Sequence, residues 1–177
     1  MRLAGWFAAC AALAAQAQAA PKAAPKPAPK APPVEARVVQ VPDASTLVVQ
    51  AADGSRQTLR LAGVEPLEPC QPGAGEARQA LAEWTQGHSV TFKAEGRDRG
   101  GRVLAHVQLE GDDLSRRLVE EGWAFSARTK WDHGPYVKQE RQAVALHRGI
   151  YALGGAVQTP ERFRREHGPC AAGTAHP

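Results

Sequence analysis

The chain has 177 residues, 43% of them hydrophobic, which is enough for one domain with a buried core. Its net charge of +4 arises at the N-terminus, because four of the 22 basic residues precede residue 34 and leave 18 to balance the 18 acidic ones. The composition therefore excludes a generally basic nucleic-acid-binding protein, and any anion-binding site must be local. The sequence also lacks the Gly-Lys-Ser/Thr loop typical of ATP-binding proteins.

Residues 1–20 are predicted to be a secretory signal peptide. Arg2 supplies a short charged region, residues 3–14 form an apolar run too short to cross a membrane comfortably, and Ala17-Gln-Ala19 is a small-x-small cleavage site. The alternative is a lipoprotein modified at Cys10, which the short apolar run before it disfavours. We therefore expect a secreted or periplasmic protein of a bacterial envelope, with no integral membrane segment after signal removal.

Residues 21–33 form a low-complexity segment of proline, alanine and lysine. Proline fixes φ and removes a backbone donor, so we expect an extended polyproline-II spacer rather than a helix or strand. The spacer could be a tether whose lysines contact an anionic polymer, or a plain linker, which we favour.

Three strands are predicted at the start of the folded domain. β-Branched residues favour strands at residues 34–41 and 46–50. Asp53-Gly54 predicts a hairpin turn, after which an alternating pattern over residues 57–62 places Arg60 on the opposite face from its leucine neighbours.

A helix and two further strands follow. Apolar residues at helical spacing, with Gly87 just beyond them, predict a helix over residues 75–86. Residues 90–94 and 103–109 are predicted to be strands, joined by a tight turn at residues 97–101.

Two helices are predicted after the fifth strand. Asp113 can cap the first, which ends at Gly122. The second starts near Pro135 and ends before Gly149. The polar segment 156–177 is expected to be a tail on the surface.

This order predicts an α+β protein, namely a five-stranded OB-fold β-barrel with about three α-helices. We expect a monomer. Four aromatic residues are expected in the core rather than as base-stacking platforms: Trp84, Trp123, Trp131 and Phe125.

Cys70 and Cys170 remain after signal removal, and an even number of cysteines in an exported chain predicts a disulfide. The bond would join the tail to the loop after Glu68 and could stabilise by up to ~4–5 kcal/mol in the chain-entropy model. The alternative is two free thiols.

Arg60 and Arg102 could together bind a phosphate, because two guanidiniums present several N–H donors to its oxygens. Glu65 and Glu68 follow the strand that carries Arg60, and a carboxylate can activate water or hold a cation. The competing interpretation is a surface ion pair between Arg60 and one of these glutamates, worth about 0–1 kcal/mol.

Several short segments occur together in one order: Asp43-Ala-Ser-Thr46, Arg60 to Glu68, Cys70-Gln-Pro, Asp98-Arg-Gly-Gly-Arg102, Leu118 to Ala124 and Gly149-Ile-Tyr151. With this order and spacing, the chain resembles the staphylococcal-nuclease-like (thermonuclease) family over about residues 36–155. The resemblance implies an OB-fold domain at residues 34–155, and many family members are exported.

The resemblance also implies cleavage of phosphodiester bonds in DNA or RNA, with Ca²⁺ as cofactor. The matching glutamate, Glu68, would help water to attack phosphorus. The matching arginines, Arg60 and Arg102, would hold the phosphate and stabilise the developing charge.

The implied metal ligands depart from the family pattern. Ser45 stands where a ligating aspartate is expected, and Glu65, followed by Pro66, replaces the second aspartate. Asp43 could compensate in part if its strand is regular, because it lies two residues before Ser45. The sequence thus predicts a degenerate metal site.

Three functions stay open. The first is an exported nuclease whose activity is weak or lost. The second is a catalytically inactive OB-fold module that binds nucleic acid, another polyanion or a protein partner. The third is a structural envelope protein in which the proline-rich tether matters most.

Overall fold

The computed structural model describes residues 32–154 and 156–170. The predicted signal peptide, the alternative lipoprotein site at Cys10 and almost all of the predicted linker lie outside these residues. Within the described ranges, no helix is both long and apolar enough to cross a membrane.

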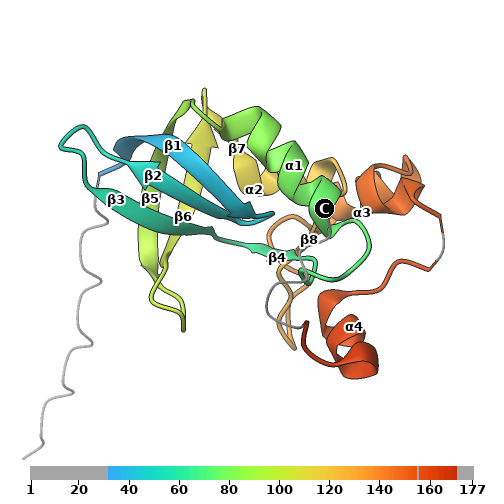
Figure 1. Ribbon diagram of the computed structural model, residues 1–177. Coiled ribbons are helices and arrows are strands. Elements are labelled where there is room, and N and C mark those ends of the chain that lie inside the picture. The colour runs from blue at the N-terminus through green and yellow to red at the C-terminus, as the bar shows by residue number, and fades with distance from the viewer. Residues whose placement is uncertain (1–31, 155, 171–177) are drawn as a thin grey trace, which may run out of the picture. The chain divides into compact units, whose positions relative to one another are not determined.

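Five strands form a closed barrel (Figure 1). They are β1 (Val34–Asp43), β2 (Thr46–Gln50), β3 (Arg56–Leu61), β5 (Ser89–Arg97) and β6 (Val103–Leu109). Neighbours in the order β3-β2-β1-β5-β6 are antiparallel, and a parallel pairing of β3 with β6, which aligns Arg60 with Leu104, closes the barrel. The predicted α+β OB-like fold is confirmed.

Alternation along the strands builds the core of the barrel. Leu47, Leu59 and Leu61 are almost completely buried, whereas Arg60, between two of them, is half-buried. Each buried leucine stabilises the fold by ~1.5–3 kcal/mol. A slip of one residue would turn Arg60 into the core, so the leucines also fix the direction in which Arg60 points.

Four α-helices accompany the barrel, together with one 3-10 helix. They are α1 (Ala74–Thr85), α2 (Leu114–Glu120), α3 (Val137–Ala145), the 3-10 helix η1 (Gly149–Ala152) and α4 (Pro160–His167). The Asp113 carboxylate accepts a hydrogen bond from the Arg116 backbone N–H at 3.1 Å, which confirms the predicted cap of α2.

Three short strands that the sequence did not predict complete the fold. β4 (Val64–Pro66) pairs with β8 (Ala124–Ser126), so that Glu65 lies opposite Phe125. A third, β7 (Asp112–Asp113), pairs with the end of β6. Two or three residues are too few for an alternating pattern, and Pro66 argues against a strand at β4, because proline cannot donate a ladder hydrogen bond.

The C-terminal tail contains a helix that the sequence did not predict. The Thr159 hydroxyl accepts a hydrogen bond from the Arg162 backbone N–H at 3.3 Å, and Pro160 occupies the first turn. Most of α4 is exposed, but only 8% of the surface of Phe163 is accessible to solvent. Figure 1 shows α4 separated from the barrel strands.

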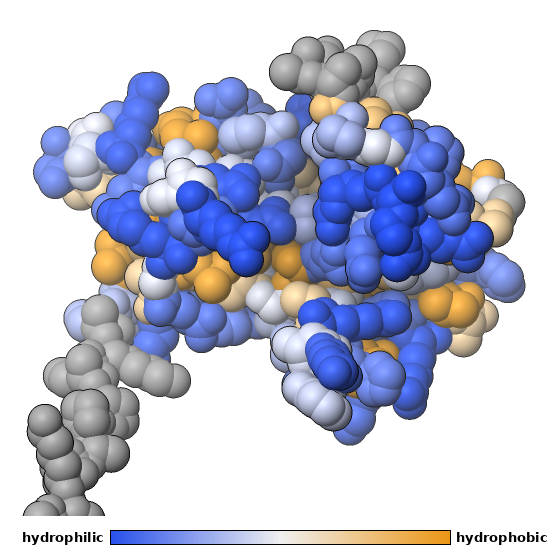
Figure 2. Space-filling view, turned by 90° about the horizontal axis from the view of Figure 1, so that it is seen from below, coloured by the Kyte–Doolittle hydropathy of each residue, from blue (hydrophilic) through white to orange (hydrophobic). Residues whose placement is uncertain are grey.

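Three of the four aromatic residues expected in the core lie there, fully or in part: Phe125, Trp84 and Trp123. The expectation is wrong for Trp131, whose exposed fraction is 86%. A turn closed by the Thr129 N–H and the Asp132 carbonyl carries the indole outward, where Lys130 Nζ lies 4.8 Å from the ring centroid. Hydrophilic side chains dominate the face seen from below, with apolar ones in small separate areas (Figure 2).

Candidate active site

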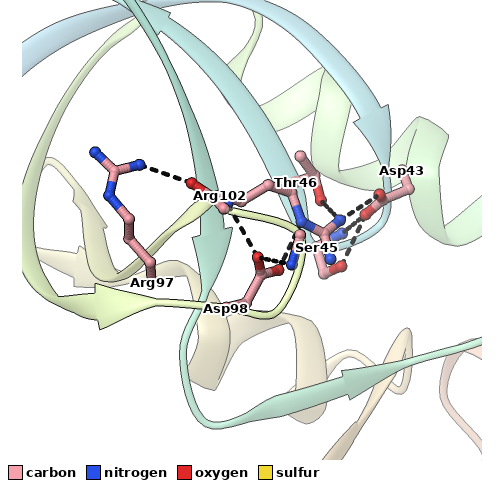
Figure 3. A network of polar contacts seen from close by, with 8 residues as sticks. Asp43, Ser45, Thr46, Arg97, Asp98 and Arg102 are labelled. Atoms are coloured by element: carbon pink, nitrogen blue, oxygen red, sulfur yellow. Dashed lines mark hydrogen bonds and ion pairs between the residues drawn. The ribbon is translucent and has the colours of Figure 1, made fainter.

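The barrel brings two arginines to one edge. Arg60 of β3 pairs with Thr46 of β2 on one side and with Leu104 of β6 on the other. Arg102 lies just before β6, and its Nη1 donates to Thr46 Oγ1 at 3.3 Å. Figure 3 shows Arg102 reaching from the β5–β6 turn toward Thr46 and Asp43. Strand pairing and the β5–β6 turn thus bring two arginines that are far apart in the sequence next to the same threonine.

Arg102 is held by the turn from which it comes. Asp98 Oδ2 accepts from Arg102 Nε at 2.7 Å, and Asp98 Oδ1 accepts from the backbone N–H groups of Gly100 and Arg102 (Figure 3). Desolvation alone would raise the pKa of the Asp98 carboxyl, but these hydrogen bonds outweigh it and lower the pKa below its ordinary value. The charge of Asp98 therefore fixes the direction of the guanidinium.

The guanidinium of Arg60 has hydrogen-bond donors available for a ligand. It makes no hydrogen bond or ion pair with other residues in the described part of the chain, although the residue is only half exposed. Burial lowers the pKa of Arg60, the charge of Asp43 raises it and the like charge of Arg102 lowers it again. A half-buried guanidinium beside a second one is the arrangement expected of a site for an anion.

The two glutamates belong to the segment after β3. Glu65 lies within β4, and burial raises the pKa of its carboxyl above the ordinary value, although the charge of Arg164 acts in the opposite direction. Glu68 lies in the following loop, where its backbone N–H donates to Gln71 Oε1 at 3.1 Å and its carbonyl accepts from the Gln71 N–H at 2.9 Å. The loop therefore has defined internal hydrogen bonds.

Arg164 of α4 reaches both glutamates. Its Nη1 forms a close ion pair with Glu68 Oε1, and its Nη2 lies 3.8 Å from Glu65 Oε1. The ion pair that the sequence suggested between Arg60 and one of these glutamates does not form; Arg164 takes that place.

The predicted disulfide between Cys70 and Cys170 is present, with 5.6 Å between the Cα atoms. It joins the loop of Glu68 to the residues that follow α4. The sequence predicts this bond but does not single out Arg164, because nothing in the local pattern of α4 marks one arginine among several. The disulfide, read together with the Thr159-Pro160 start of a helix, was the available signal.

The residues expected to hold Ca²⁺ are otherwise engaged. The Ser45 hydroxyl is fully buried and donates to Asp43 Oδ1 at 2.7 Å, and the Ser45 backbone N–H donates to the same oxygen at 2.8 Å. Asp43 Oδ2 lies 3.9 Å from Arg102 Nη1, and Glu65 faces Arg164.

Among the described residues, no three histidine, cysteine or acidic side chains gather closely enough to hold a metal ion. Ca²⁺ requires six to eight oxygen ligands, several of them charged. The donor set of Asp43, Ser45 and Glu65 therefore does not fit Ca²⁺.

Comparisons with known proteins agree with this geometry. A family model described as "Staphylococcal nuclease homologue" matches residues 58–152. The thermonuclease of Staphylococcus hyicus is 32% identical over 134 residues, which are 66% of this chain and 75% of that protein. An uncharacterized endonuclease of Haemophilus influenzae is 25% identical over 131 residues, 73% of this chain and 72% of that protein.

A longer plant relative matches as well. The "Probable staphylococcal-like nuclease CAN1" of Oryza sativa subsp. japonica is 30% identical over 128 residues. These residues are 72% of this chain, but they span only 37% of the rice protein.

Proposed function

The chain belongs to the staphylococcal nuclease homologue family, and from this premise we propose that it is an exported nuclease that hydrolyses phosphodiester bonds in DNA or RNA. The observation that carries the proposal is the guanidinium of Arg60, half-buried and without a partner among the described residues, beside Arg102. A phosphodiester is the anion that two such guanidiniums suit, because each of its non-bridging oxygens can accept from both.

Each residue has a role in this proposal. Arg60 and Arg102 bind the non-bridging oxygens and stabilise the charge that grows on them in the transition state. Glu68 Oε1 is engaged by Arg164, which leaves Oε2 to accept the proton of the attacking water. We assign no Ca²⁺ to the site, because the donor set does not fit it, and we expect the activity to be weak compared with that of a nuclease with a complete site.

The test is cleavage of single-stranded DNA and of RNA by the purified full-length chain, with EDTA, Ca²⁺ or Mn²⁺. Glu68→Gln should lower the rate by about 100-fold or more, since general base catalysis contributes at least that much. Glu76→Gln, an exposed glutamate on α1, is the matched control and should leave the rate unchanged. Cleavage by Glu68→Gln at the parent rate would overturn the proposal.

A second function is favoured by the incomplete donor set. A catalytically inactive OB-fold module would keep the arginines to bind nucleic acid, another polyanion or a protein partner in the cell envelope. It would bind a fluorescent single-stranded oligonucleotide or heparin through Arg60 and Arg102 without cleavage under any of the three metal conditions. Cleavage that depends on Glu68 would exclude it.

We also propose that the protein is secreted or periplasmic and monomeric. The Cys70–Cys170 disulfide supports export, because such bonds persist in oxidising compartments. Cell fractionation, non-reducing peptide mapping and light scattering test these points. Two free thiols in a cytoplasmic fraction would contradict export, and a mass of two chains would contradict a monomer.

A further inference from the structure

α4 is fixed at both ends to the loop that carries Glu68. Before the helix, the Gln158 carbonyl accepts a hydrogen bond from Gln71 Nε2 at 2.7 Å. After the helix, Cys170 is bonded to Cys70, and the Cys70 backbone N–H donates to Cys170 Sγ at 3.0 Å. A helix anchored at two points has little freedom to move away from this loop.

The buried side of α4 also lines a cavity next to the glutamate loop. Phe163 is buried and lines a cavity of about 290 Å³ that Leu67 and Ile150 also line. Leu67 immediately precedes Glu68, so this cavity lies between the buried side of α4 and the glutamate loop. The next residue in α4 after Phe163 is Arg164.

Arg164 differs from the other arginines of its helix. Arg162 pairs with Glu166 and Arg165 pairs with Glu161, both four residues away within α4. Arg164 instead points out of the helix to Glu65 and Glu68. Surface pairs within a helix contribute little, whereas the Arg164 contacts join two segments that are about 100 residues apart.

The charge balance of the site explains what Arg164 contributes. Without it, the site carries an excess of negative charge that would repel a phosphodiester. The groups concerned are four carboxylates and two guanidiniums: Asp43, Glu65, Glu68, Asp98, Arg60 and Arg102. Arg164 adds one positive charge beside the two carboxylates of the glutamate loop and so halves this excess.

We propose that Arg164 is the built-in cation of the site: its guanidinium lies between Glu65 and Glu68, supplies the positive charge that a divalent ion would otherwise bring, and lets the site bind a nucleic-acid phosphate without metal. The proposal rests on the proposed function for the nature of the anion. Arg164 is a positioning residue, because it acts through the two glutamates. Arg164 also keeps divalent ions away from Glu65 and Glu68, because such an ion must displace the guanidinium to reach these carboxylates.

The main experiment measures binding of a fluorescent single-stranded DNA oligonucleotide, in EDTA and in Ca²⁺, by the full-length chain. The parent should bind equally in both. Arg164→Gln should bind at least about tenfold more weakly in EDTA, because the uncovered carboxylates of Glu65 and Glu68 repel the phosphates, and Ca²⁺ should restore much of the loss. Arg164→Lys keeps the charge but not the forked set of donors. Its affinity in EDTA should therefore lie between those of the parent and Arg164→Gln.

Arg162→Gln is the matched control, since it removes an arginine of the same helix that does not face the site. It should behave as the parent does. A purely structural role of α4 would weaken binding equally in EDTA and Ca²⁺, and would overturn the proposal. Tighter oligonucleotide binding by Arg164→Gln would also overturn the proposal, because Arg164 would then block access of the nucleic acid to Glu68.

A second measurement needs no nucleic acid and separates failure of this inference from failure of the proposed function. Terbium luminescence reports binding of a trivalent ion that takes the same oxygen ligands as Ca²⁺. Arg164→Gln should bind Tb³⁺ at least about tenfold more tightly than the parent, because two carboxylates are freed. Equal Tb³⁺ binding overturns the inference even if the protein cleaves DNA. Tighter Tb³⁺ binding without any oligonucleotide binding supports the placement of Arg164 but refutes the nuclease proposal.

Discussion

The arginine side and the glutamate side of the candidate site depend on different parts of the chain. Arg60 and Arg102 are placed by the pairing of β3 with β2 and β6, whose register follows from buried leucines. Glu65 and Glu68 follow the barrel strand, and a disulfide and α4 hold their loop in place. The first side is built from local alternation, and the second from contacts that span most of the domain.

Breaking the barrel should abolish both sides at once. Leu61→Ala removes a leucine that is 1% exposed next to Arg60 and should cost about 2–5 kcal/mol of unfolding free energy. Urea unfolding measures the loss. Leu146→Ala, at a position 54% exposed, is the control and should change stability little. Equal losses in the two variants would show that Leu61 contributes no more to the stability of the barrel than an exposed leucine does.

Removing the disulfide should loosen the glutamate side and spare the arginine side. The double variant Cys70→Ser, Cys170→Ser should lose about 2–4 kcal/mol of global stability, because its unfolded chain regains freedom. At native conditions, residues 66–72 and α4 should open at a much lower free energy than β2, β3 and β6, whose slowest amides should follow only the global loss of stability. Equal opening free energies in the two regions would mean that the two sides are not separate.

Within the arginine side, Asp98→Asn tests how far one carboxylate positions Arg102. Oligonucleotide binding should fall by about tenfold, since the charged hydrogen bond to Arg102 Nε is lost. Asp53→Asn is the matched control, because Asp53 accepts the Ser55 backbone N–H in a similar turn away from the site. Unchanged binding by Asp98→Asn would show that Thr46 and the chain direction suffice to place Arg102.

The smallest effect concerns the pH dependence of the glutamate side. Burial raises the pKa of Glu65 above its ordinary 4.5, against the effect of Arg164. The folded protein then binds more protons than the unfolded chain, so stability falls as pH rises from about 4.5 through the raised pKa. Glu65→Gln should remove this decrease and be the more stable form above that window.

Urea midpoints on either side of the window measure this prediction. Glu76→Gln, exposed on α1, should keep the pH dependence of the parent. Parallel curves for the parent and Glu65→Gln would contradict the prediction and place the raised pKa elsewhere.

Much of the barrel could be predicted from the sequence. The positions of Leu59 and Leu61 on either side of Arg60, the Asp53-Gly54 turn and the Asp113 cap are local patterns, each with one structural meaning. Local patterns could not predict the position of Trp131. An indole is apolar whether it is buried or not, and the direction of the loop that carries Trp131 leaves it exposed.

For the candidate site, the sequence by itself determined which residues were available: two arginines, the glutamates after the third strand, and the two cysteines. It could not determine which charges meet, because an ion pair depends on the distance between side chains and not on their spacing along the chain. Only the tertiary structure placed Arg164, rather than Arg60, against Glu65 and Glu68, by anchoring α4 through the disulfide and the burial of Phe163. Only the structure showed that the buried Ser45 hydroxyl donates to Asp43, two residues earlier, which leaves too few free oxygens for the cation that the family resemblance implied.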